Sequence, residues 1–314
     1  MAAHSTHQDA APLSERAITG AYAELEALLA LRLRSANATP RQTRRRNPNS
    51  GQRLSRLRGR GVDFAEVRAY QPGDDVRSID WRVTARKNEP HTKVFREERE
   101  RPTLICVDQT RSMFFGSRLR LKSVAAAELA ARAAWQALAN GDRVGGLIIG
   151  NDTSTLAKPK RSSRAVARML GDLSKANASL SRHSSNTSAD YLARELTHLR
   201  RLAQTNHRIV VLTDFQPAGA YWVDTLRGLA RHNDVIAVHI VDPMEQQLPI
   251  AEQFMVSDGS SRVPVDGADA GLRNRYQQRF AAQQRKLQQT LTQSAVRYLQ
   301  VSTDSNLDRL DLWR

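Results

Sequence analysis

Short apolar stretches alternate with longer segments of helical periodicity from Pro102 to the end of the sequence. In these stretches hydrophobic residues stand at consecutive positions, which is typical of parallel strands that helices cover on both faces. Strands and helices in alternation form a doubly wound sheet with right-handed crossovers. We therefore predict an α/β fold with a doubly wound, mostly parallel sheet over residues 102–314, built on the strands TLICVD, DRVGGLIIG, RIVVLTD and DVIAVHIVD.

Between these strands, apolar residues at helical spacing predict four helices, and a short edge strand is expected as well. These elements lie at about residues 118–140, 165–173, 188–204 and 218–232, with the edge strand near residues 153–157. The remainder fits one more turn of the same architecture: a strand at EQFMVSD, a long Gln-rich helix over about residues 268–292, the strand VRYLQVST and a short terminal helix. No separate C-terminal domain is expected.

The first hundred residues predict two further segments. Residues 1–40 are expected to hold a disordered tail and a helix over about residues 13–33. From residue 41 to 101 we expect a basic, loop-rich arm followed by a small β-rich subdomain, in which QPGD forms a type II turn. The arm, residues 41–60, holds eight arginines and no acidic residue, and its densest part is Arg44, Arg45 and Arg46.

The overall charge raises the question of an anionic partner. The formal net charge is +16, which is compatible with binding to nucleic acid or to an anionic lipid surface. The arm lacks the aromatic residues on which bases stack, so a solvated loop that pairs with acidic residues elsewhere is an equal alternative. The single cysteine and the lack of an apolar leader or a membrane-spanning run lead us to expect a cytoplasmic protein.

Oxygen-bearing side chains follow two of the predicted strands. Asp108, Thr110 and Ser112 stand at alternate positions after the first strand, and Asp214 ends the strand RIVVLTD. Because the carboxyl ends of parallel strands meet at one rim of the sheet, we expect these four side chains to lie close together. Carboxylate and hydroxyl oxygens suit a hard divalent cation. The sequence therefore predicts a Mg²⁺ site, with Mn²⁺ as the other candidate, and the alternative is that these residues cap helices and turns.

The DxTxS pattern and the later aspartate resemble the metal site of the von Willebrand factor A fold. The upstream segment GRGVDFAEVRAYQPGDDVRSIDWRVTARKNEPHTKVFREE is similar to the signature of a bacterial family, domain of unknown function 58, whose members carry such a domain. The resemblance covers most of residues 50–245. It implies that Thr187 is the second motif of the metal site, and that the partner is a MoxR-type AAA+ ATPase with which the protein acts as an adaptor.

The signature segment alternates acidic and basic residues and adds two large aromatic side chains. We expect mainly a structural role, as an ion-pair network that fastens the β-rich subdomain to the sheet, with ligand contact as the alternative. The residues concerned are Arg68, Tyr70, Gly73, Asp74, Asp75, Arg77, Asp80, Trp81 and Arg86.

Three classes of function fit these features. The first is a non-enzymatic interaction module in which a partner's carboxylate completes the coordination of the rim metal. The second is a phosphatase of the haloacid-dehalogenase type, but Thr110 stands where its general-acid Asp is needed, and the phosphate-binding motifs GxxxxGK[ST] and GxGxxG are absent. The third is nucleic-acid or anionic-surface binding by the arm. We expect the first class. A membrane-associated protein or another von Willebrand A protein is an alternative partner.

Overall fold

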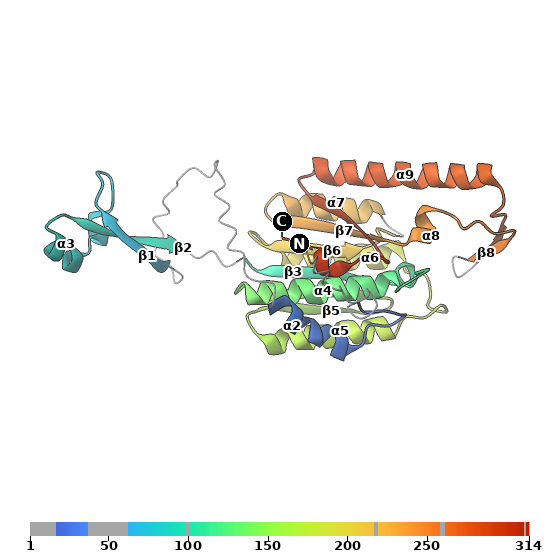
Figure 1. The fold of residues 1–314 in the computed structure, drawn as a ribbon, viewed down its shortest axis with the longest axis horizontal. Helices are drawn as coiled ribbons and strands as arrows, with labels where there is room; N and C mark the ends of the chain where they lie inside the picture. The colour runs from blue at the N-terminus through green and yellow to red at the C-terminus, as the bar shows by residue number, and fades with distance from the viewer. Residues whose placement is uncertain are drawn as a thin grey trace, which may run out of the picture. The chain divides into compact units, whose positions relative to one another are not determined.

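A six-stranded sheet of order β10-β7-β6-β3-β4-β5 forms the centre of the larger of two compact units (Figure 1). The computed structural model describes residues 17–36, 62–97, 101–216, 219–257, 261–310 and 312–313. Neighbouring strands of the sheet are parallel except β5, which runs antiparallel to β4. This architecture confirms the predicted α/β class. The strands are β3 (Thr103–Gln109), β4 (Val144–Gly150), β5 (Ser154–Lys160), β6 (Arg208–Thr213), β7 (Asp234–Val241) and β10 (Arg297–Ser302).

Helices cover both faces of the sheet and bury two separate apolar clusters. Because every residue of β3 and β4 is buried, these strands need apolar side chains toward both faces, as the sequence predicts. One face packs against α4 (Lys122–Ala139) and α5 (Ser163–Ala178), and α2 (Leu25–Ala36) lies over these helices. The other face packs against α6 (Ala189–Leu202), α7 (Gly219–Ala230) and α9 (Ala270–Gln293).

A buried charge network holds α4 against the chain segments around it. Glu128, in the middle of α4, is fully buried and pairs with Arg120 and, at 2.6 Å, with Arg132. The same carboxylate accepts a hydrogen bond from the backbone amide of Ile18 (3.1 Å). Arg120 in turn donates to the carbonyl oxygen of Thr303 (2.9 Å), beyond the end of β10. One carboxylate therefore links the N-terminal segment, α4 and the C-terminal segment.

The N-terminal region differs from the expectation. The helix predicted from about residue 13 begins only at Leu25, and residues 17–24 are not helical, with Gly20 in the left-handed region (φ 94°). The α2 helix packs on α4, where the Trp135 indole donates to the carbonyl oxygen of Leu28 (3.1 Å). This helix is thus part of the α/β unit rather than of a separate segment.

The segment EQFMVSD does not add a strand to the main sheet. Instead β8 (Phe254–Ser257) pairs with β9 (Arg262–Val265) as an antiparallel hairpin. Met255 is 59% exposed, whereas a strand inside the doubly wound sheet is buried on both faces. The extended stretch RVPV follows so closely that local pairing needs only a short loop, which costs little closure entropy.

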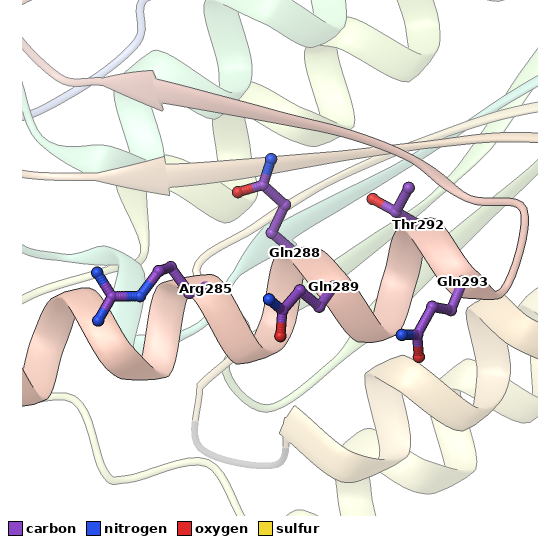
Figure 2. A pocket seen from close by; sticks show the side chains of 5 residues that line it. All are labelled: Arg285, Gln288, Gln289, Thr292 and Gln293. Carbon is purple, nitrogen blue, oxygen red and sulfur yellow. The ribbon is translucent and has the colours of Figure 1, made fainter.

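Helix α9 returns the chain from this hairpin to the start of β10. Figure 2 shows a hollow along its C-terminal half, near the amino ends of the strands, lined by Arg285, Gln288, Gln289, Thr292 and Gln293.

Among the described residues, no helix is long and apolar enough to cross a bilayer.

The smaller unit, residues 41–100, is built on an antiparallel pair of strands. Its turn at QPGD places Gly73 in the left-handed region (φ 106°), and the amide of Asp74 donates to the carbonyl oxygen of Gln71 (3.0 Å). This is the geometry that a type II turn requires of the glycine. The elements are β1 (Val62–Ala69), the 3₁₀ turn η1 (Val76–Ser78), α3 (Trp81–Lys87) and β2 (His91–Glu97).

Candidate metal centre

Two aspartates meet at the carboxyl rim of the sheet, where β3 and β6 lie side by side. Asp108 is the last residue but one of β3, and Asp214 directly follows β6. The hydroxyl of Thr213 donates to Asp108 Oδ2 (2.7 Å) and so joins the two strand ends. The parallel pairing therefore brings together two residues that lie far apart in the sequence, as the rim argument predicts.

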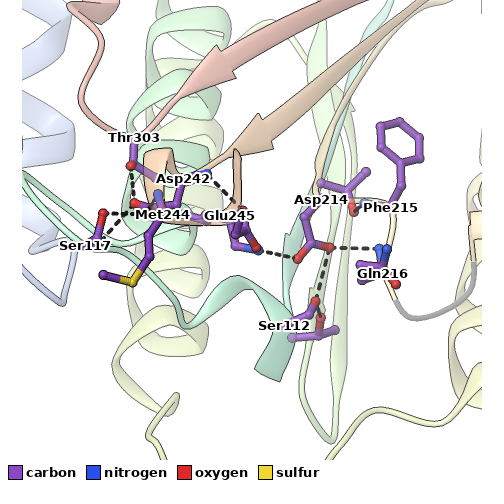
Figure 3. Close-up of polar contacts among 12 residues, drawn as sticks. Ser112, Ser117, Asp214, Phe215, Gln216, Asp242, Met244, Glu245 and Thr303 are labelled. Atoms are coloured by element: carbon purple, nitrogen blue, oxygen red, sulfur yellow. Dashed lines mark hydrogen bonds and ion pairs between the residues drawn. The ribbon is translucent and has the colours of Figure 1, made fainter. Parts of the chain in front are cut away.

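A chain of hydroxyl groups connects these carboxylates. Thr110 Oγ1 donates to Asp108 Oδ1 (2.7 Å), and Ser112 Oγ donates to Asp214 Oδ1 (3.2 Å). Figure 3 shows the second contact, together with the amide of Gln216, which donates to the same Asp214 oxygen (2.9 Å). The two hydroxyl oxygens lie 3.3 Å apart. Four of the five predicted metal ligands thus form one connected group.

The hydroxyl of Thr187 has a different partner. Within the described residues it donates to Asn151 Oδ1 (3.2 Å) and not to the other four predicted ligands. The same Asn151 oxygen accepts from the backbone amide of Arg111 (3.0 Å), so Thr187 reaches the rim loop only through Asn151. Its neighbour Ser188 caps α6 by accepting from the amide of Tyr191 (3.1 Å).

A buried lysine, which the sequence did not single out, completes the rim. Lys122 is 2% exposed, and its ammonium donates to Asp214 Oδ2 (2.8 Å) and to Glu245 Oε1 (2.6 Å). It is the first residue of α4, and Glu245 lies in the short helix α8 (Pro243–Gln246) after β7. The one available signal was a lysine at the start of an alanine-rich apolar helix, where a charge needs a partner.

Burial shapes the charge of the rim. Burial and the nearby Asp214 raise the pKa of Asp108 to about 7, although three hydrogen bonds from Thr213 and Thr110 favour the carboxylate. Burial also raises the pKa of Glu245 even though the Lys122 ammonium opposes the shift. For Lys122 itself, burial disfavours the ammonium, but Asp214 and Glu245 outweigh this and raise its pKa, so that it stays charged. Burial therefore disfavours the ionised form of Asp108 and Glu245, while Lys122 stays charged between Asp214 and Glu245.

The donor set fits a hard divalent cation. Thr110 and Ser112 each give their single proton to a carboxylate, so the lone pairs of both oxygens are left to accept. Their separation of 3.3 Å is close to the ~3.0 Å between adjacent oxygens that bind Mg²⁺ at about 2.1 Å in octahedral geometry. Within the described part of the chain Thr110 makes no helix-capping bond with its side chain. The two aspartates do cap turns, as the alternative expects, because Asp108 accepts from the amide of Thr110 and Asp214 from the amide of Gln216.

Protein carboxylates would supply only part of the coordination shell. Among the described residues, no three His, Cys, Asp or Glu side chains gather as a metal-binding group. Hydroxyl oxygens and water would supply the other ligands, which matches the preference of Mg²⁺ for keeping several waters.

A third strand-end aspartate lies beside this group and has a structural role. Asp242, directly after β7, is fully buried and accepts from the hydroxyls of Ser117 (2.5 Å) and Thr303 (2.6 Å) and from the amide of Met244 (2.9 Å) (Figure 3). Burial alone would raise its pKa, but these hydrogen bonds outweigh burial and lower it. Asp242 therefore fastens the loop before α4 to the ends of β7 and β10.

The signature residues have local roles in the smaller unit. Arg68 pairs with Asp74 at 2.7 Å, and the side chains of Asp75 and Asp80 cap η1 and α3. Trp81 is 68% exposed in this unit. The fastening of the unit to the sheet stays a prediction. The basic arm with Arg44, Arg45 and Arg46 lies outside the described residues.

The sequence and structure of the chain are similar to those of several known proteins. The uncharacterized proteins Mb1516 of Mycobacterium bovis and Rv1480 of Mycobacterium tuberculosis are each 29% identical to it over 259 residues, which is 81% of this chain and 78% of theirs. Among solved structures, BatB from Bacteroides thetaiotaomicron is similar with a TM-score of 0.42 and 14% identity, over 67% of this chain and 94% of BatB. The SpRpn10 VWA domain has a TM-score of 0.32 and 11% identity, over 67% and 92% of the two chains.

The family model described as protein of unknown function DUF58 matches residues 66–286. The match begins in β1, includes every strand of the main sheet except β10, and contains all five predicted metal ligands. Because it spans more than half of the sequence, the chain belongs to the DUF58 family.

Proposed function

We propose that this protein is an interaction module that binds its partner at the carboxyl rim of the sheet through a divalent cation. The observation that supports this most strongly is the connected group of Asp108, Thr110, Ser112 and Asp214, in which two hydroxyl oxygens keep their lone pairs free. Ser112 is only partly buried, so a ligand can approach the group on its side.

A bound Mg²⁺ or Mn²⁺ would supply a coordination position that a carboxylate of the partner can fill. Thr110, Ser112 and Asp214 would hold the ion, and Asp108 would orient Thr110 through the bond to its hydroxyl. Thr213 fixes the orientation of Asp108 from the neighbouring strand. The predicted ligands that follow β3 are therefore held in place before an ion binds, which lowers the entropic cost of binding.

The proposed partner is a MoxR-type AAA+ ATPase, as the resemblance to the domain of unknown function 58 family implies. The membership of this chain in the family supports that choice. If the contact is bridged by a metal, chelation should remove it, whereas moderate salt should have a smaller effect because a desolvated contact is poorly screened.

Capture of the ATPase by the immobilised protein tests the proposal. We expect wild type to retain the ATPase in Mg²⁺ and to lose it in chelator, and Ser112→Ala to reduce retention about tenfold, as loss of a metal-site group commonly does. Ser163→Ala, a change of the same kind at the start of α5, is the matched control and should bind like wild type. Equal retention by wild type and Ser112→Ala, unaffected by chelator, would exclude the rim as the docking surface. Retention that only salt abolishes would favour the basic arm instead.

We also expect no phosphatase activity, because Thr110 occupies the place of the general acid and its proton is held by Asp108. Purified protein should turn over neither a generic phosphate ester nor ATP above the buffer rate. Turnover that survives repeated purification and disappears in Asp108→Asn would show that the protein is an enzyme.

A further inference from the structure

Lys122 places the positive charge of its own side chain inside the proposed metal centre. Its ammonium lies within hydrogen-bond distance of Asp214 Oδ2 (2.8 Å), while the other oxygen of that carboxylate accepts from Ser112. The Glu245 carboxylate, 2.6 Å away, holds the ammonium from the opposite element, α8. A lysine is rarely buried without such partners. Any cation that binds beside Ser112 therefore shares Asp214 with Lys122.

The charges of the rim can be counted from its hydrogen-bonded network. In the described part of the chain one ammonium, that of Lys122, donates to the carboxylates of Asp214 and Glu245. The carboxylate of Asp108 lies in the same group through Thr110, whose hydroxyl oxygen is 3.3 Å from that of Ser112. With all groups ionised the net charge is −2, from three negative charges and one positive charge. A divalent cation would neutralise it.

The neighbouring basic side chains have other hydrogen-bond partners among the described residues. The buried Arg120 pairs with Glu128, and the guanidinium of Arg111 donates to the carbonyl oxygen of Arg182 (3.2 Å). His239 lies beside Phe215, and burial lowers its pKa to about 4, so it is neutral near pH 7. Arg111 keeps its positive charge, but in the part of the chain that the structure describes Lys122 is the cation that donates directly to a carboxylate of the proposed metal centre.

We propose that Lys122 sets the affinity of the rim for divalent cations, because its ammonium competes with the ion for Asp214 and offsets one of the three carboxylates. This inference rests on the proposed function, since it requires the rim to bind an ion. Its consequence is weak, reversible binding, so that the metal-bridged contact forms and breaks with the supply of metal and partner. An uncharged side chain at this position would convert a weak site into a tight one.

Titration of the full-length protein with Mn²⁺, followed by calorimetry and by the electron paramagnetic resonance signal of free Mn²⁺, tests the inference. Lys122→Met keeps the length of the side chain and removes its charge, and we expect it to bind roughly 10- to 100-fold more tightly, since like charges this close repel strongly in a buried site. The double variant Lys122→Met/Glu245→Gln restores a net charge of −2 and should return affinity toward that of wild type. Lys160→Met removes an exposed charge at the opposite end of the sheet, where Lys160 pairs with Val144, and should bind like wild type.

Each outcome separates this inference from the proposed function. Tighter binding by Lys122→Met, reversed in the double variant, supports the role of Lys122. Wild-type binding together with equal or weaker binding by Lys122→Met overturns that role and leaves the metal site standing. Failure of both proteins to bind millimolar Mn²⁺ overturns the metal site itself. If Lys122→Met is unstable without metal, its Tm should rise with Mn²⁺ more steeply than that of wild type, and an equal or smaller rise also overturns the role of Lys122.

Discussion

Glu128→Ala is expected to lower the free energy of unfolding by about 3–5 kcal/mol, the range found when one partner of a buried ion pair is removed. The substitution leaves the fully buried Arg120 without its counter-charge and deprives the amide of Ile18 of its acceptor. It also removes one of the two carboxylates that pair with Arg132, which retains its ion pair with Asp308 (2.5 Å). We therefore expect the N-terminal and C-terminal segments to loosen together.

Urea unfolding followed by circular dichroism measures this effect. Glu128→Gln, which keeps the volume but removes the charge, should show most of the loss. Glu26→Ala, an exposed glutamate in the first turn of α2, is the matched control and should change stability by no more than about 0.5 kcal/mol. A loss below about 1 kcal/mol for Glu128→Ala would mean that the network contributes little, as a solvent-exposed ion pair does.

Asp108→Asn is expected to weaken the binding of Mg²⁺ or Mn²⁺ about 100-fold, the upper end of what the loss of a group that orients a metal ligand costs. The amide keeps the shape of the side chain but removes a negative charge. It also replaces one of the two oxygens that accept from Thr110 and Thr213, so at least one of these hydroxyls must turn. The fold should persist because β3 is otherwise unchanged.

Isothermal titration of wild type and Asp108→Asn at one pH measures the change. The control is Asp224→Asn, which removes a carboxylate that is exposed on α7 and pairs with Arg227 (3.2 Å). Its affinity for metal should equal that of wild type. Unchanged metal binding in Asp108→Asn would place the site elsewhere.

The four central strands β3, β4, β6 and β7 are predictable because they are buried on both faces, so each stands in the sequence as a mostly apolar run. The edge strands β5 and β10 are more exposed and more polar. The prediction that the segment EQFMVSD joins the sheet is wrong: β8 is short, and its exposed Met255 and Val256 belong to a local hairpin. The N-terminal helix is shorter than its prediction, because helical spacing of apolar residues continues through residues 17–24, where Gly20 bends the chain.

For the candidate site, sequence reasoning finds the residues that follow strands and misses those that reach the rim from helices. Parallel pairing fixes where strands end, so the sequence alone suffices to place Asp108 and Asp214 together. Lys122 and Glu245 come from the starts of α4 and α8, and the path of the connecting loops determines where those helices begin. Thr187 is predicted as a ligand by resemblance alone, and in the structure its hydroxyl donates to Asn151.

The backbone of Phe215, at the rim of the sheet, is strained. This buried residue has φ 62°, which is a genuine outlier for a bulky side chain, and it directly follows Asp214. Its ring packs edge-on against Trp222 and His239, which hold the turn in place. Strain of this kind is retained most often where a functional side chain must be aimed, which agrees with a role for the Asp214 carboxylate.

We propose that the rim of the sheet holds a divalent cation between its two strand ends. The most direct test is a crystal of the full-length protein grown with Mn²⁺, with diffraction data collected at a wavelength where Mn scatters anomalously. We predict an anomalous peak within about 2.2 Å of the hydroxyl oxygens of Thr110 and Ser112, as oxygen ligation of a small divalent ion requires. A map without a peak at the rim, with Lys122 still paired to Asp214 at millimolar Mn²⁺, would contradict the claim.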